Sequence, residues 1–100
     1  MNVISRPAID RAIQRHPICK SWLERWWNIA NSQQVQWTCL QDVRKAYSDA
    51  DQVGNRLIFN ATSGRRLIVG VRYADSARSG TLFVKHFLTH AEYDRGNWKG

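Results

Sequence analysis

The first half of the chain carries apolar residues at the three- and four-residue spacing of amphipathic helices. Residues 6–16 form one narrow apolar stripe of this kind. Pro17 ends that helix, and a broader, tryptophan-rich stripe follows over residues 18–31. A shorter helix is predicted over residues 38–47, with Thr38 as its cap. The pattern therefore predicts two to three N-terminal helices, each of which buries one face.

The second half changes to the two-residue period of β-strands. Residues 56–61 and 66–73 alternate on either side of the turn 62–64, which predicts a hairpin, and residues 81–89 predict a further strand. In this last strand the alternation assigns one face to Leu82, Val84, His86 and Leu88, and the other to Phe83, Lys85, Phe87 and Thr89. Across the strands one face is apolar, and the other collects Arg56, Asn60, Arg66, Arg72 and Lys85.

Helices followed by meandering strands are typical of an α+β domain. We expect residues 1–100 to form one domain, in which two to three helices pack on one face of an antiparallel sheet of three to four strands. We expect the other face to be basic, concave and largely free, a shape that suits the backbone of a nucleic acid. Residues 90–96 predict a closing helical turn that ends at Gly96.

The charge of the chain indicates a polyanionic partner. The 100 residues include 15 Lys and Arg against 8 Asp and Glu, which gives a formal charge of +7 and a pI near 10.1. Residues 54–90 hold six of the basic side chains, five of them arginine, and a single acid, Asp75. Arginine suits bidentate phosphate contacts, so nucleic acid or an acidic protein is favoured as the partner. A solvated basic surface without a partner is the alternative.

Other classes of protein are excluded by what the sequence lacks. The apolar runs are far shorter than a membrane span, and the N-terminus has no basic-then-apolar signal pattern, so we expect a cytoplasmic protein without a membrane partner. Cys19 and Cys39 lack metal-ligand spacing. His86 and His90 would lie roughly 13 Å apart on an extended strand, too far for a shared zinc ion. We therefore expect no metal site and no cofactor.

Several segments resemble the HigB family of bacterial toxins. They are VGNRLIFN at 53–60, Gly64 with RLI at 66–68, FVK at 83–85 and, most specifically, THAEYD at 89–94. Weaker matches, such as His16-Pro17, extend the resemblance from Asn2 to about Asp94. Where the family usually reads FNIGGNKYRLI, this chain reads FNATSGRRLI, one residue shorter. This shorter hairpin leaves open whether Arg65 or Arg66 faces a substrate.

The resemblance implies both a fold and a function. HigB toxins belong to the RelE-like toxins, which resemble small microbial ribonucleases in fold. The resemblance implies an mRNA endonuclease that acts on messages in the ribosome, in contact with 16S rRNA. It also implies a HigA-type helix-turn-helix antitoxin, which holds the toxin inactive and through which the complex binds operator DNA. Two alternatives stay open: a non-catalytic nucleic-acid-binding or regulatory module, and a decayed toxin that only binds its antitoxin.

The THAEYD segment carries the candidate catalytic chemistry. RNA cleavage without a metal requires that the 2′-OH lose a proton, that the phosphate charge be stabilised and that the leaving 5′-oxygen be protonated. Histidine as a residue type titrates near neutrality, so His90 is the first candidate for proton transfer, with a capping or packing histidine as the alternative. Three roles are open for Tyr93: its ring stacks on a base, its hydroxyl hydrogen-bonds the phosphate, or it is a core residue. Asp94 either orients His90 or is an exposed acid, and Thr89 and Glu92 are expected to hold the turn.

Basic side chains complete the predicted site. Lys85 and Arg66 would contact the phosphate and stabilise the charge of the transition state. Arg44 and Lys45 on the third helix are candidates for contacts with ribosomal RNA, and a solvated helix face is the alternative for either. The other predicted RNA-binding residues are Arg65, Arg72, Arg56 and Asn60.

Overall fold

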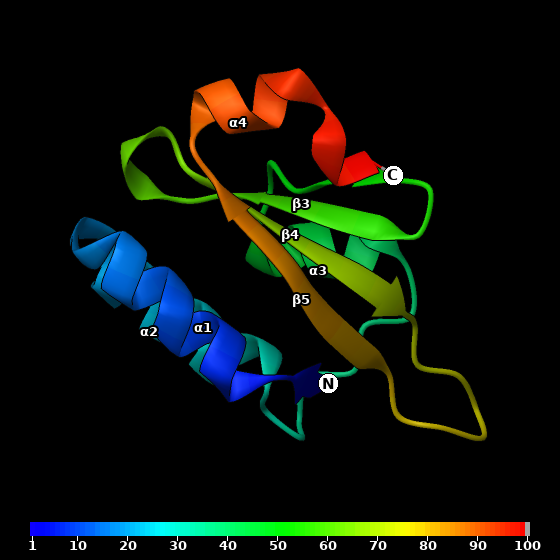
Figure 1. The fold of residues 1–100 in the computed structure, drawn as a ribbon. Coiled ribbons are helices and arrows are strands. Elements are labelled where there is room, and N and C mark those ends of the chain that lie inside the picture. Colours follow the sequence, from blue (N-terminus) through cyan, green and yellow to red (C-terminus); the bar gives the residue numbers. More distant parts are fainter. Residues whose placement is uncertain (100) are drawn as a thin grey trace.

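The protein is an α+β structure whose helices and strands follow the predicted order (Figure 1). The computed structural model describes residues 1–99. Its strands are β1 (Asn2–Ile4), β2 (Asp51–Val53), β3 (Arg56–Asn60), β4 (Arg66–Arg72) and β5 (Thr81–Leu88). Its helices are α1 (Arg6–Arg15), α2 (Lys20–Ala30), α3 (Leu40–Ala46) and α4 (His90–Arg95), with 3-10 turns at Pro17–Cys19, Thr62–Gly64 and Asn97–Lys99. The predicted helices and the β3–β4 hairpin are confirmed.

The strands form one mixed sheet in the order β1-β5-β4-β3-β2. The strands β2 to β5 are antiparallel neighbours, whereas β1 pairs in parallel with β5. The sheet is therefore larger than the expected three to four strands, and it is not purely antiparallel. The two outermost strands, β1 and β2, span three residues each, which is too short for a two-residue period to identify them.

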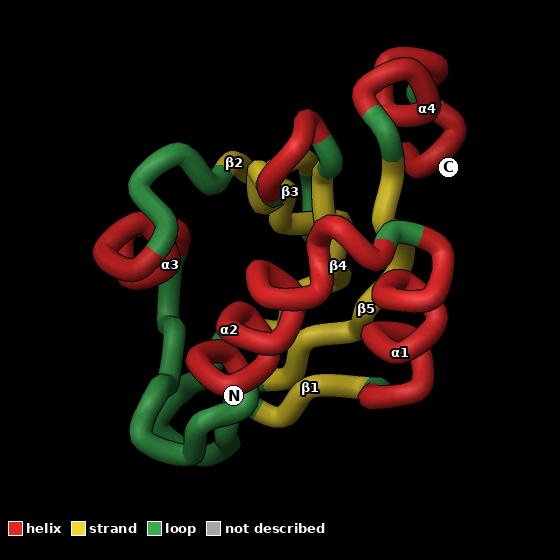
Figure 2. Tube along the Cα trace, turned by 90° about the vertical axis from the view of Figure 1, so that its left-hand side faces the viewer, coloured by secondary structure: helices red, strands yellow, loops and turns green. Residues whose placement is uncertain are grey.

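The helices α1, α2 and α3 pack on one face of this sheet, where the main core lies (Figure 2). Trp26 of α2 and Phe59 of β3 are fully buried there, and their rings meet edge to face with centroids 5.6 Å apart. Tyr47, at the end of α3, contacts the same phenyl ring at 5.2 Å. The tryptophan-rich stripe predicted for residues 18–31 therefore faces the core from Leu23 to Ala30, whereas Ile18, which the prediction placed in the same stripe, is 70% exposed.

A bulge in β5 changes which of its side chains face the helices. Ile68 of β4 pairs with His86, but the next residue, Val69, pairs with Val84, so Lys85 is an extra residue in the strand. The predicted alternation holds up to Lys85, which shares the face of Phe83, and is wrong from His86 on. Phe87 enters the main core, whereas His86 lies opposite Ile68, whose side chain belongs to the other face.

The second face of the sheet is partly covered, so the expectation of a largely free face is wrong. Trp98, in the 3-10 turn after α4, is only 2% exposed and packs against Ile58 and Ile68. Leu88 and Tyr93 border this second cluster. The apolar side chains that alternate with the arginines on this face favour burial, and the C-terminal segment provides it. Figure 1 shows α4 and this segment across one end of the sheet.

Candidate functional site

The helix α4 begins directly after β5 and is fixed by its first turn. The Thr89 hydroxyl accepts a hydrogen bond from the Glu92 backbone N–H at 3.3 Å, and the Glu92 carboxylate accepts one from the Thr89 N–H at 3.0 Å. The hydrogen bonds from Thr89 lower the pKa of Glu92. Gly96 ends the helix with a φ of 76°, a left-handed conformation that suits glycine. Thr89 and Glu92 therefore hold the turn, as the sequence predicted.

The imidazole of His90 lies on the exposed side of α4 beside a carboxylate. His90 Nε2 and Asp94 Oδ2 are 3.2 Å apart, and the two side chains are 65% and 60% exposed. A neutral imidazole that donates Nε2–H to Asp94 leaves Nδ1 as a proton acceptor. Asp94 is an exposed acid, and it also lies within ion-pair distance of His90. His90 is accessible to a substrate and is not a packing residue.

Tyr93 connects α4 to β4. The guanidinium carbon of Arg66 lies over the Tyr93 ring, 4.3 Å from its centre. The ring also stacks on Trp98, with centroids 4.9 Å apart and planes 16° from parallel, and the Trp98 indole N–H donates to the Tyr93 carbonyl at 2.9 Å. The structure thus brings Arg66 and Tyr93 together, as predicted. It adds Trp98, which the sequence analysis did not select.

Arg66 is held in place by a hydrogen-bonded chain of polar side chains. Its Nε donates to Asn60 Oδ1 at 2.9 Å, and the Asn60 amide donates to Asp49 at 3.0 Å. Both ends of the Asn60 side chain are therefore occupied, so this residue positions Arg66. Within residues 1–99, the two terminal nitrogens of Arg66 have no hydrogen-bond partner, so they are available to a phosphate.

Arg65 and Arg66 lie on opposite sides of the sheet. Arg65 Nε donates to His16 Nδ1 at 3.4 Å, next to α1, and its Nη1 donates to the Ser63 carbonyl at 2.7 Å. The turn before them contains two residues with positive φ, Ser63 at 58° and Gly64 at 73°, and it sets this register. Arg66 therefore shares the side of α4, and Arg65 does not.

A basic hollow of about 490 Å³ lies on the same face of the sheet, farther from α4. It is lined by Asn55, Arg56, Gly70, Val71, Arg72, Phe83 and Lys85. The amine of Lys85 is 5.7 Å from the centre of the Phe83 ring. His86, the next residue in the chain, is half-buried. Its burial lowers its pKa, and the positive charges of Arg56 and Lys85 lower it further. Lys85 therefore lies in this hollow, whereas Arg66 lies under α4.

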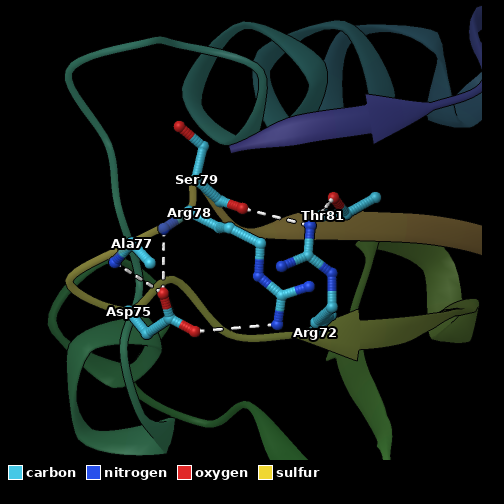
Figure 3. A network of polar contacts seen from close by, with 6 residues as sticks. All are labelled: Arg72, Asp75, Ala77, Arg78, Ser79 and Thr81. Atoms are coloured by element: carbon cyan, nitrogen blue, oxygen red, sulfur yellow. Dashed lines mark hydrogen bonds and ion pairs between the residues drawn. The ribbon is translucent and has the colours of Figure 1, made fainter.

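Arg56 and Arg72 are both engaged with other parts of the chain. Arg56 donates through Nη1 to the carbonyl of Trp98 and so anchors the C-terminal segment. Arg72 Nη2 donates to the Ser79 carbonyl at 3.2 Å and to the Thr81 hydroxyl at 2.8 Å, which fixes the β4–β5 loop (Figure 3). At 3.3 Å per residue, Arg72 lies about 20 Å along β4 from Arg66. It does not join the group around α4.

Arg44 and Lys45 lie in another part of the molecule. Arg44 Nε donates to the Ala50 carbonyl at 2.8 Å and its Nη2 lies 3.7 Å from Asp51. Lys45 lies 3.6 Å from Asp42 on the exposed side of α3. Figure 2 shows α3 and α4 on opposite sides of the sheet. These two cations are therefore separate from the group around α4.

Four functional candidates were missed in the sequence: Asp49, His16, His86 and Trp98. Their positions depend on tertiary pairing, and only the tryptophan had a local signal, as a large apolar side chain in an otherwise polar tail.

In the part of the chain that the structure describes, no group of three or more His, Cys, Asp or Glu is placed to hold a metal ion. No helix there is long and apolar enough to span a membrane.

Comparison with known proteins identifies the family. No curated protein matches the chain. The model of the HigB toxin family, described as the RelE-like toxic component of a toxin-antitoxin system, matches residues 19–96. This range includes α2, α3, the strands β2 to β5 and α4. The resemblance stated from the sequence is confirmed, and the chain belongs to the HigB toxin family, whose members are the toxic half of a toxin-antitoxin pair.

Proposed function

We propose that this toxin is a ribosome-dependent mRNA endonuclease, or mRNA interferase, whose catalytic residues lie where α4 meets β4. The observation that carries the proposal is the fixed guanidinium of Arg66, held over Tyr93 by Asn60 with its terminal nitrogens open, next to the turn that presents His90. Arg66 offers a cation for a phosphate, and the short helix α4 carries an imidazole at His90 and a hydroxyl at Tyr93, three residues apart. We further propose a HigA-type antitoxin as its partner and the cytoplasm as its location.

The proposed reaction is an attack of the ribose 2′-oxygen on the adjacent phosphorus. His90 takes the 2′-hydroxyl proton through Nδ1, while Asp94 holds Nε2. The O2′–P bond forms, the P–O5′ bond breaks, and the leaving O5′ takes a proton from solvent water, to which the His90 imidazolium then returns its own proton. The products are a 2′,3′-cyclic phosphate and a 5′-hydroxyl end. Arg66 stabilises the additional charge on the phosphate.

Tyr93 and Lys85 take supporting roles in this proposal. The Tyr93 ring contacts Arg66 and Trp98, so we assign its hydroxyl, and not its ring, to the phosphate. Lys85 lies in the basic hollow beyond, and we assign it to a neighbouring phosphate of the same strand. The backbone of a message that crosses this face would meet both groups in turn.

The exposure of the site supports a requirement for the ribosome. His90 is 65% exposed and lies on a short surface helix, so the chain alone offers little enclosure to hold a nucleotide in the attack geometry. Ribosomal RNA around a bound message would provide it. We assign Arg44, Lys45 and Arg65, which lie away from α4, to contacts with 16S rRNA. Binding to the phosphates of rRNA needs only charges at the surface, even where salt screens them.

A translating cell-free extract with one labelled message tests this proposal. The toxin should cut the message only within its translated region, and a message without a start codon should stay intact. The His90→Ala, Tyr93→Phe double variant should lose about 100-fold or more of the rate. The control is Arg25→Ala, which removes an exposed cation from α2 on the helical side. Undiminished cleavage by the double variant would contradict the site assignment.

A further inference from the structure

A second candidate site lies at the edge of the sheet, between α1 and β5. The groove has a volume of about 220 Å³. One wall is α1 with the residue that follows it, and the other is residues 84–88 of β5. The α1 side contributes Ala8, Arg11, Ala12, Arg15 and His16. Figure 1 shows α1 running alongside β5 at this edge.

The wall formed by β5 has an open strand edge. β1 pairs only with Thr81–Phe83, and the chain then turns at Ser5 into α1. Beyond Phe83, β5 is paired with β4 on one side, and no strand among residues 1–99 pairs with its other side. Unpaired strand edges accept an extended peptide through main-chain hydrogen bonds. The small side chains of Ala8 and Ala12 on the facing helix leave room for such a backbone.

The groove is also positively charged. Arg11 and Arg15 project from exposed positions on α1. Arg15 has Glu92 4.0 Å away at the end of the groove, a distance at which the pair leaves most of the guanidinium available. Since cations predominate, a chain that enters here is favoured if it carries acidic side chains.

His16 adds a buried hydrogen-bond donor to the groove. The side chain is 9% exposed, and its Nδ1 accepts from Arg65 Nε. A neutral imidazole with Nδ1 as acceptor carries its proton on Nε2, and burial and the cations Arg65 and Arg15 lower its pKa and so keep it neutral. His16 Nε2 is buried and has no partner within the described chain. A buried donor without a partner is costly, so an acceptor that reaches it is bound favourably.

We propose that the antitoxin inserts an extended segment with at least one Asp or Glu into this groove. The segment adds as a strand to residues 84–88 of β5, and its carboxylate meets Arg11, Arg15 and the Nε2–H of His16. A peptide fits the open strand edge, which presents alternating N–H and C=O groups, better than an RNA backbone does, because each peptide unit supplies both an N–H and a C=O, whereas the only donors of an RNA backbone are its 2′-hydroxyls. The inference goes beyond the proposed activity: it needs the antitoxin and does not depend on RNA cleavage.

The position of the groove gives the bound segment a way to inhibit. His86 and Leu88 line this groove and also the small hollow under α4, which Glu92, Arg95 and Trp98 complete. A strand added to this part of β5 therefore lies beside the candidate site. It would restrict access to that site without occupying the position of the scissile phosphate.

Charge reversal on α1 tests the proposal. The probe is the full-length antitoxin encoded beside the toxin gene, with affinity measured by titration calorimetry against the full toxin chain. Arg11→Glu with Arg15→Glu should weaken binding about 100-fold, because two carboxylate contacts become repulsive. The control, Lys20→Glu with Arg25→Glu, makes the same change of charge at exposed positions of α2 and should alter affinity less than about threefold.

A second measurement uses the unaltered chain. In the complex, hydrogen exchange of the amides in residues 84–88 should slow, whereas the amides of the opposite edge strand, β2, should not change. His16→Phe keeps a ring against Phe87 and removes the Nε2–H, so it should weaken binding about tenfold. Unchanged exchange at residues 84–88 would overturn the proposal. So would an Arg11, Arg15 variant that binds antitoxin normally but no longer associates with ribosomes, since the groove would then be an RNA surface.

Discussion

At the scale of single residues, the two adjacent arginines of the β3–β4 hairpin show how the fold separates neighbours in sequence. Arg66 lies over Tyr93 and is fixed by Asn60, whereas Arg65 turns to His16 beside α1. The left-handed residues of the turn, Ser63 and Gly64, bring this about. Two side chains with the same chemistry therefore take different roles.

This separation predicts different effects of two otherwise identical substitutions. Arg66→Ala should lower the rate of message cleavage about 100-fold, because it removes a preorganised charge from the phosphate. Arg65→Ala should lower it less than about fivefold, the effect of one screened ribosomal contact. Initial rates in a translating extract measure both. Equal losses for the two variants would mean that Arg66 has no particular role at the phosphate.

Two histidines give the fold a dependence on pH. Burial lowers the pKa of His16 and of His86 below the ordinary 6.5, and adjacent cations lower both further. As the pH falls below about 6.5, the unfolded chain therefore binds protons that the folded chain does not, and the free energy of unfolding decreases. Above about pH 7 both states hold neutral imidazoles, and this contribution to the pH dependence disappears.

Urea unfolding at several pH values tests this prediction. The free energy of unfolding should fall between about pH 7 and pH 5, and His16→Phe should reduce the fall. The carboxyls of Asp42, Asp75 and Glu92 have lowered pKa values, so they titrate mainly below this range. The same slope in His16→Phe as in the native chain would show that His16 titrates alike in both states.

At the scale of elements, α4 and the 3-10 turn after it act as one cover over the second face of the sheet. Trp98 packs against Ile58 and Ile68, and its indole ring also stacks on the Tyr93 ring. Packing and the candidate chemistry therefore depend on the same indole. The capping box of Thr89 and Glu92 fixes the other end of the cover to β5.

Removal of Trp98 should therefore affect both stability and activity. Trp98→Ala should cost about 3–5 kcal/mol in the free energy of unfolding, as for other large buried aromatic side chains. It should also reduce cleavage at a temperature where the variant remains folded, because Tyr93 loses its stacking partner. Trp98→Phe, which keeps a ring, should restore most of both. A destabilised variant with native cleavage would show that the stack does not position Tyr93.

The cap at the start of α4 contributes less to the free energy of unfolding than Trp98 does. Thr89→Ala should cost about 1 kcal/mol, and Thr89→Ser, which keeps the hydroxyl, should cost much less. Faster hydrogen exchange in residues 90–95 of the alanine variant measures the fraying directly. Native exchange there would indicate that contacts with the sheet, and not the cap, hold the helix.

Local pattern predicted part of this structure and tertiary pairing decided the rest. The period of the apolar residues predicted three helices and the hairpin, and Thr89 with Glu92 predicted the turn, because these depend on neighbours in sequence. The bulge at Lys85 reversed the faces of residues 86–88 of β5, and it depends on register with β4. The cover by Trp98 and the partnership of Asp49 with Asn60 likewise join distant segments. Of the predicted site residues, Arg66 and Tyr93 meet, whereas Lys85, Arg56 and Arg72 border a separate hollow.

At the scale of the whole molecule, the sheet separates three surfaces. Its helical face is the core, its second face carries the candidate catalytic residues, and its β5 edge presents the groove proposed for the antitoxin. A net charge of +7 attracts the whole molecule to a polyanion such as the ribosome, whichever surface of the protein approaches first. The affinity for ribosomes should accordingly fall steeply as salt increases, whereas the position of cleavage should not change.

Cleavage of translated messages by attack of the 2′-oxygen, as proposed, is tested most directly by mapping and chemically typing message ends in cells after the toxin is induced. We expect new ends within translated regions, with 5′-hydroxyl groups on the downstream fragments and 2′,3′-cyclic phosphates on the upstream ones. Growth arrest with intact messages, or downstream fragments that begin with a 5′-phosphate, would contradict it.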